Sequence, residues 1–380
     1  LSCSDRLRSG SNGNERITNT LAFPDASVAR SSEGNTGVSG VSELSGEPRE
    51  AEGVPPPELS VVVVTYNEEQ RIRDCLDSVF RTCEGLTTFE VVLVDSNSTD
   101  RTVEIAREFP VTVLQIADDD ITTPAAGRFV GTQTARANRI LFVDGDMILR
   151  RAWLSEALSY LREHPDVAGV DGELNEPAGA EHPRPIDAIR GVALYEADAL
   201  DAVGGFDPYL RSLEDVYLGF ELITAGYDLY RLPSVAADHP DRSPVSDPVR
   251  RWRRGYMDGT GQAIRKSLRR PRVLAKVVGR LRYKLFLSTW LLIGMVAALS
   301  ASVLVVWLAL SALGASVVAS RLGLGGTVYF FYAKFVGILG MVRGLRIQPR
   351  DPEGFPLESV QEIQRGTVQS GSGTRRDRAE

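Results

Sequence analysis

The stretch "LSVVVVTYN", residues 59–67, decides the fold class of this 380-residue chain. Its consecutive valines lack the apolar and polar alternation of a strand with one solvent-facing side, which predicts a strand buried on both faces. The following residues, "EEQRIRDCLDSVF", carry apolar side chains at helical spacing and predict an amphipathic helix. A buried strand followed by a helix is typical of a parallel sheet that is covered by helices.

The same pattern recurs along the chain. Further buried strands are predicted at 89–95, 111–116 and 139–144, with helical segments between them. We therefore expect an α/β fold with a mainly parallel sheet and helices on both faces. Ligands of such sheets bind at the carboxyl ends of the strands. Polar residues follow three of these ends, at 65–68, 95–97 and 144–146, so we predict a site there.

The strand at 139–144 ends on two acids, Asp144 and Asp146, with only Gly145 between them. Two carboxylates this close repel each other unless a cation or water relieves them. Mg²⁺ and Mn²⁺ prefer oxygen ligands of this kind, so a divalent cation fits the pair. A plain turn with the same sequence is the alternative.

Four motifs occur in an order and at a spacing that resemble glycosyltransferase family 2: "SVVVVTYNEEQRIRDCLDSV", "VDSNSTDRT", "VDGDM" and "VGGFDPYLRSLEDVYLGFELITAGY". The resemblance covers about residues 59–245. It is closest in kind to membrane-anchored archaeal or bacterial enzymes that act on dolichyl- or polyprenyl-linked sugars. It implies a GT-A (Rossmann-like) fold and inverting transfer of a sugar from a nucleotide-diphosphate donor, with Mg²⁺ or Mn²⁺ as cofactor.

The resemblance also implies roles for individual residues of the donor site. Nucleotide binding falls to Thr65, Tyr66, Glu68, Asp95 and Arg128, and the metal to Asp144, Asp146 and His239. Within the first set, Tyr66 lies beside the base, Glu68 faces the ribose, Asp95 hydrogen-bonds the base and Arg128 grips phosphate. The alternatives are that Asp95 caps a turn, that Arg128 is a surface residue and that His239 is a loop residue.

Inversion requires a base that takes the proton of the acceptor hydroxyl. By position in the family motif, Asp215 is this catalytic base, and Glu214 orients the base or the acceptor. The alternative is a pair of helix-start acids, which the helix dipole favours.

The chain after the catalytic motifs indicates a membrane protein. Residues 250–284 contain thirteen basic residues and one acid, Asp258, and the next 36 residues carry no charge. One crossing needs about 20 apolar residues, so we expect two tight spans, or one span and an interfacial piece. Basic flanks stay in the cytoplasm, which predicts a multi-pass protein of the cell membrane with a cytoplasmic catalytic domain.

The expected organisation follows from these observations. A disordered tail (1–57) precedes the GT-A domain (58–245) and a basic juxtamembrane segment (246–284). A transmembrane region (285–320), a third apolar or interfacial segment (321–347) and a polar tail (348–380) complete it. The expected partners are a nucleotide-sugar donor, a lipid-linked acceptor (a polyprenyl or dolichyl phosphate, or its oligosaccharide) and the membrane; the net charge of −7 argues against nucleic acid. This organisation fits an enzyme of protein glycosylation or of surface polysaccharide synthesis. The alternatives are a non-catalytic nucleotide-sugar-binding scaffold, a membrane-embedded transporter subunit and a processive polysaccharide synthase.

Overall fold

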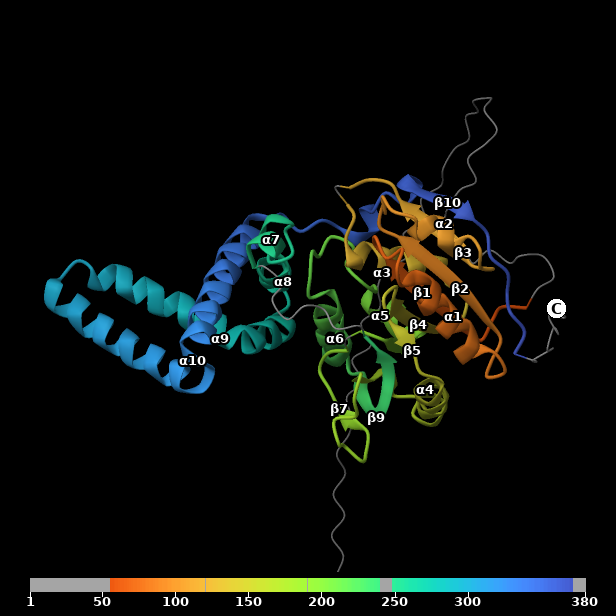
Figure 1. Cartoon of the computed structure of the whole chain (residues 1–380), viewed down its shortest axis with the longest axis horizontal. Coiled ribbons are helices and arrows are strands. Elements are labelled where there is room, and N and C mark those ends of the chain that lie inside the picture. The colour runs from red at the N-terminus through yellow and green to blue at the C-terminus, as the bar shows by residue number, and fades with distance from the viewer. Residues whose placement is uncertain (1–54, 120, 190, 240–247, 372–380) are drawn as a thin grey trace, which may run out of the picture. The chain divides into compact units, whose positions relative to one another are not determined.

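The structure is a computed structural model and describes residues 55–119, 121–189, 191–239 and 248–371. The predicted N-terminal tail, except for residues 55–57, lies outside the described residues. The predicted strands are confirmed: β1 (Leu59–Thr65), β2 (Phe89–Asp95), β3 (Thr112–Ile116) and β4 (Arg139–Asp144) lie side by side (Figure 1). The remaining strands are β5 (Ile148–Leu149), β6 (Val167–Leu174), β7 (Arg184–Pro185), β8 (Ala193–Glu196), β9 (Asp228–Asp238) and β10 (Val360–Gln364).

These strands form one ten-stranded sheet in the order β10-β3-β2-β1-β4-β8-β6-β9-β5, with β7 paired to β9. The pairs among β3, β2, β1 and β4 are parallel, as is the pair of β6 and β9. The expectation of a mainly parallel sheet is wrong for the other half, because β8 runs antiparallel to both β4 and β6. The reason is that β8, "ALYE", is too short and too weakly β-branched to signal a strand.

Both faces of the sheet are buried, as the valine run predicts. Val61 and Val63 of β1 lie in one apolar core, and Val62 and Val64 lie in the other, on the opposite face. Helices that cover the domain are α1 (Ile72–Cys83), α2 (Thr102–Ala106), α3 (Pro124–Thr134), α4 (Arg151–Glu163), α5 (Ala197–Val203) and α6 (Glu214–Ala225).

The C-terminal region is helical. Its helices are α7 (Pro248–Arg253), α8 (Gly259–Ser267), α9 (Pro271–Ala297) and α10 (Ala301–Arg346). Figure 1 shows α9 and the first part of α10 side by side, and the rings of Trp290 and Trp307 stack between them at 5.9 Å. Gly323 has φ 70° and breaks the helical backbone of α10.

The charge-free run 285–320 is therefore divided between the end of α9 and the first part of α10. Among the described residues, one helix is long and apolar enough to cross a membrane by length and composition, and it is α10. After two short 3₁₀ turns, Pro352–Gly354 and Leu357–Ser359, the segment predicted as a polar tail returns to the sheet. There β10 pairs antiparallel with the edge strand β3.

Candidate active site

The polar strand ends meet at one edge of the sheet. Thr65 pairs with Asp95 across β1 and β2, and Val64 pairs with Asp144 across β1 and β4. The loops that follow these three strands therefore begin next to one another. The sequence predicts this arrangement because the carboxyl ends of parallel strands share an edge.

The loops after β1 and β2 are held by hydrogen bonds between short polar side chains. Asp95 is fully buried and accepts from the backbone N and Oγ of Ser98 and from Nε2 of Gln115. Asn67, at φ 54°, accepts from the backbone N of Thr99 at 2.8 Å. Asp95 thus fixes the loop after β2, as the turn-capping alternative predicts. Its contact with a nucleotide base stays a prediction.

Two predicted nucleotide residues lie on the β1 loop. The side chain of Tyr66 is 49% exposed and is available for stacking on a ligand. Glu68 forms an ion pair with Arg71 at 3.0 Å, and its backbone N donates to Oγ1 of Thr102. These contacts fix the Glu68 backbone at the start of α1.

The turn after β4 packs tightly against β1. A Cβ atom on Gly145 would lie 2.8 Å from Oγ1 of Thr65, so any larger residue between the two acids would displace its neighbours. The side chain of Asp146 is buried, and its Oδ2 lies 3.7 Å from Nε2 of His239. The structure therefore brings Asp146 and His239 together, while the other acid, Asp144, points to a different partner.

That partner is Arg128, a buried arginine at the centre of a cluster of charges. Its guanidinium contacts Oδ1 of Asp144 at 2.8 Å, Oε1 of Glu214 at 3.3 Å and Oδ1 of Asp215 at 3.4 Å. The Arg128 side chain is 5% exposed. Burial lowers the pKa of Arg128, but Asp215, Asp144 and Glu214 outweigh burial and raise this pKa above its ordinary value. One arginine thus links the predicted metal pair to the predicted base.

Close packing of α3 on β1 places this arginine. Cβ atoms on Gly127 and Gly131 would lie 2.6 Å and 2.2 Å from the valine methyls of β1, so the helix approaches closer than any larger residue allows. At the start of α3, Thr123 accepts a hydrogen bond from the backbone N of Ala126 and caps the helix.

Backbone strain lies directly before the acid pair. Leu213, the N-cap residue of α6, has φ 65°, a left-handed conformation that is unfavourable for a side chain of this kind. Contacts from the juxtamembrane segment hold this loop: Oγ of Ser212 donates to the carbonyl of Tyr256, and the backbone N of Arg211 donates to Oε1 of Gln262. Strained backbone that its surroundings enforce is frequent at functional sites.

Two tyrosines at this site carry no signal in the sequence. Tyr195 of β8 is buried, and its pKa is raised by burial, then by Asp215 and Asp171. Tyr256 follows α7, and its pKa is raised by burial, then by Glu214. The basic flank of Tyr256 indicates membrane orientation only, so nothing in the sequence connects this residue to the acid pair.

A divalent cation fits part of this arrangement. Asp146 and His239 offer a carboxylate oxygen and an imidazole nitrogen, a donor pair that suits Mn²⁺. Within the described ranges, no group of three His, Cys, Asp or Glu side chains is arranged to hold a metal. The residues present therefore supply a partial ligand set, which the oxygens of a diphosphate would complete.

The site thus combines an Asp-Gly-Asp turn at the end of β4 with an acid pair at the start of α6. This combination is the one that the sequence motifs predict. Residues 60–213 match the family model described as glycosyl transferase family 2. Over these residues, the chain is similar to family 2 glycosyltransferases.

Individual relatives agree with this assignment. The chain is 28% identical over 206 residues to glycosyltransferase AglE of Haloferax volcanii, covering 49% of this chain and 68% of AglE. It is 34% identical over 110 residues to the poly(ribitol-phosphate) β-N-acetylglucosaminyltransferase TarS of Staphylococcus aureus, covering 28% of this chain but only 19% of TarS.

One solved structure supports the fold. The mannosyltransferase PcManGT of Pyrobaculum calidifontis, in complex with GDP-Man and Mn²⁺, aligns with a TM-score of 0.56. The alignment covers 77% of this chain and 88% of that protein at 20% identity. The similarity confirms the predicted GT-A fold.

Proposed function

We propose that this chain transfers a sugar, with inversion, from a nucleotide-diphosphate donor to a lipid-linked acceptor at the cytoplasmic face of a membrane. The observation that carries the proposal is the cluster around Arg128, which joins Asp144 of the strand end to Glu214 and Asp215 of α6. The cluster supports the proposal because the residues proposed for the donor and for the acceptor contact the same guanidinium, at 2.8 to 3.4 Å.

Asp215 is the proposed base. Its side chain is 23% exposed, so an acceptor hydroxyl can reach it, and its Oδ1 lies 3.4 Å from Nε of Arg128. Asp215 takes the proton of the acceptor hydroxyl as the oxygen attacks the anomeric carbon. Glu214, at 11% exposure and on the same arginine, is a positioning residue for this carboxylate.

The donor side is proposed to use the loops after β1, β2 and β4. Tyr66 stacks on the base, Thr65, Glu68 and Asp95 shape its pocket, and Asp146 with His239 holds the cation. When bound, the cation neutralises the charge that develops on the departing diphosphate. The complex of PcManGT with GDP-Man and Mn²⁺ supports a donor and a cation of this class.

Membrane association is proposed from the apolar part of α9 and from α10, with basic residues between 250 and 284 on the cytoplasmic side. The lipid-linked acceptor rests on this location. Protease added to sealed right-side-out cells should leave residues 59–245 intact, and digestion of that domain would reverse the orientation.

The substitution Asp215→Asn tests the catalytic proposal. It keeps the size of the side chain but removes the basic oxygen, so transfer should fall by about 10²–10⁴-fold. Donor affinity, measured by calorimetry, should stay unchanged. Asp198→Asn is a matched control, because Asp198 is also a first-turn acid, of α5.

The outcomes of this experiment separate the hypotheses. Wild-type transfer by Asp215→Asn would show that Asp215 is only a helix-start acid. Donor binding without any transfer by the wild-type chain, across a panel of lipid-linked acceptors, would favour the non-catalytic scaffold. Equal losses in both variants would point to a general effect of first-turn acids.

A further inference from the structure

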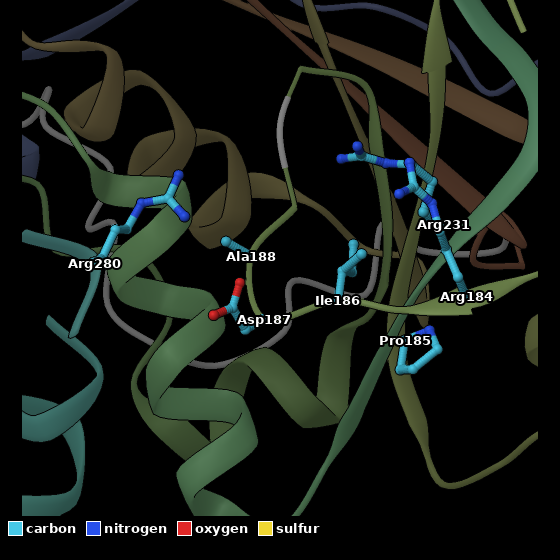
Figure 2. A pocket seen from close by; sticks show the side chains of 7 residues that line it. All are labelled: Arg184, Pro185, Ile186, Asp187, Ala188, Arg231 and Arg280. Carbon is cyan, nitrogen blue, oxygen red and sulfur yellow. The ribbon is translucent and has the colours of Figure 1, made fainter. Parts of the chain in front are cut away.

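A cavity of about 430 Å³ lies apart from the residues assigned above to donor and base. Figure 2 shows Arg184 and Arg231 on one side of it, Arg280 on the other, and Asp187 with Ala188 between them. Arg184 belongs to β7 and Arg231 to β9, whereas Arg280 belongs to the juxtamembrane helix α9. The volume falls within the range of small-ligand sites, about 300–1,000 Å³.

Two of the three arginines are fixed in place by ion pairs. Arg231 binds the fully buried Asp171 through Nε and Nη2, at 2.7 and 2.5 Å, and Arg184 binds Glu173 at 2.6 Å. A guanidinium has five N–H donors, so each of these residues retains donors beyond the ones used by its acid. The wall of the cavity is thus a set of oriented donors that lose little entropy when a ligand binds.

The third arginine supplies a charge outside the ion pairs of the described residues. Arg280 is exposed and makes no ion pair with any residue in the described part of the chain. Arg184 and Arg231 are each paired with an acid behind the wall, so Arg280 and Asp187 are the lining charges outside those two pairs. Convergent guanidinium groups of this kind bind phosphate through paired, charge-assisted hydrogen bonds.

The position of Arg280 along α9 indicates where the ligand comes from. Arg280 precedes Leu285, the first residue of the charge-free run, by five residues, which is about 7.5 Å along a helix. The polar layer on each side of a bilayer core is about 5–8 Å thick. If the charge-free run is embedded, the cavity opens at the depth of lipid head groups.

We propose that this cavity binds the phosphate of a membrane lipid, of the phosphomonoester class that phosphatidic acid and polyprenyl phosphates share. Basic pockets beside membrane helices on the cytoplasmic side recognise such head groups. Ala188 of the cavity packs in the same apolar cluster as Val216, the residue after Asp215. A lipid phosphate bound here lies beside the catalytic helix α6. The inference rests on the proposed membrane association and is independent of sugar transfer.

The test uses the full chain in detergent micelles, titrated with phosphatidic acid, with phosphatidylcholine of the same acyl chains and with inorganic phosphate. Arg280→Ala is compared with Arg282→Ala, since Arg282 is also an exposed arginine of α9 but points about 200° around the helix. Each variant removes one positive charge, and only Arg280 lines the cavity.

We expect wild type to bind phosphatidic acid in preference to phosphatidylcholine. Arg280→Ala should weaken phosphatidic acid binding about tenfold more than Arg282→Ala, the loss of a charged hydrogen bond. Asp187→Asn removes the opposing charge and should strengthen binding about fivefold.

Three results would overturn the proposal: equal weakening in the two arginine variants, equal affinity for the two lipids, or full affinity for inorganic phosphate alone. The last of these would assign the site to free phosphate. Because lipid binding is the readout, failure here leaves the test of Asp215 intact, and the reverse also holds.

Discussion

Replacing the buried Arg128 by glutamine should destabilise the chain more than the same replacement at an arginine whose ion pair is partly exposed. The change removes the guanidinium from three carboxylates within 3.4 Å and leaves these acids, Asp144, Glu214 and Asp215, facing one another. Glutamine is similar in length and remains polar, so the loss of stability measures the contribution of the guanidinium charge and its N–H donors.

The magnitude follows from the burial of the cluster. The side chains of Arg128 and Glu214 are 5% and 11% exposed, so water screens their interaction poorly. Removing one partner of a buried ion pair costs about 3–5 kcal/mol. For a domain of this size, that loss corresponds to a melting temperature lower by about 10 °C.

The measurement is thermal unfolding of the full chain in detergent micelles, with donor calorimetry on the same samples. Arg139→Gln is the matched control, because Arg139 pairs with Glu196 at 2.8 Å and both side chains are about a quarter exposed, at 26% and 24%. Its loss should cost less than about 1 kcal/mol.

The two roles considered for Arg128 give opposite results. A cluster that holds the acids in place predicts a large loss of stability with a smaller loss of donor affinity. If Arg128→Gln melts like Arg139→Gln and loses donor affinity instead, the arginine serves the donor phosphate and the reasoning from the ion pairs is refuted.

Three further results are expected. Asp146→Ala should abolish metal-dependent donor binding, and calorimetry with equal donor affinity in the presence and absence of EDTA would contradict the cation assignment. Gly145→Ala should lower the stability by about 1–3 kcal/mol, since its Cβ would lie 2.8 Å from Oγ1 of Thr65; an unchanged melting temperature would show that the turn relaxes. Burial raises the pKa of Glu221 from 4.5 to about 7, with Lys266 and Arg270 offsetting it in part. A raised carboxyl pKa stabilises the protonated folded form, so wild type should lose up to about 3 kcal/mol as pH rises through this window, and Glu221→Gln should not. Parallel melting curves of the two proteins from pH 4.5 to 8 would disprove the assignment.

The sequence predicts the parallel half of the sheet well, because β1 to β4 are long apolar runs and their polar ends must share one edge. The start of α6 at Glu214 is predicted equally well. The antiparallel half is not predicted: β8 has four residues, and β6, "VAGVDGEL", is interrupted by glycines. Short or glycine-containing strands depend on their neighbours and give little local signal.

Within the site, the sequence predicts which residue types gather and not which of them pair. Asp144 and Asp146 look equivalent in the sequence, yet one contacts Arg128 and the other lies near His239. Tyr195 and Tyr256 come close to the acids through antiparallel pairing and through packing of the juxtamembrane segment. Both arise from tertiary contacts that no local pattern encodes.

Because the chain returns to the sheet through β10, the number of times that it can cross a bilayer must be even. Residues on both sides of the apolar helices pair with one sheet: β1 and β2 before them, and β10, at the edge of β3, after them. A strand cannot hydrogen-bond to a sheet on the opposite side of a membrane. The polypeptide between Arg253 and Val360 therefore crosses an even number of times, either zero or two, and a single crossing by α10 is topologically forbidden.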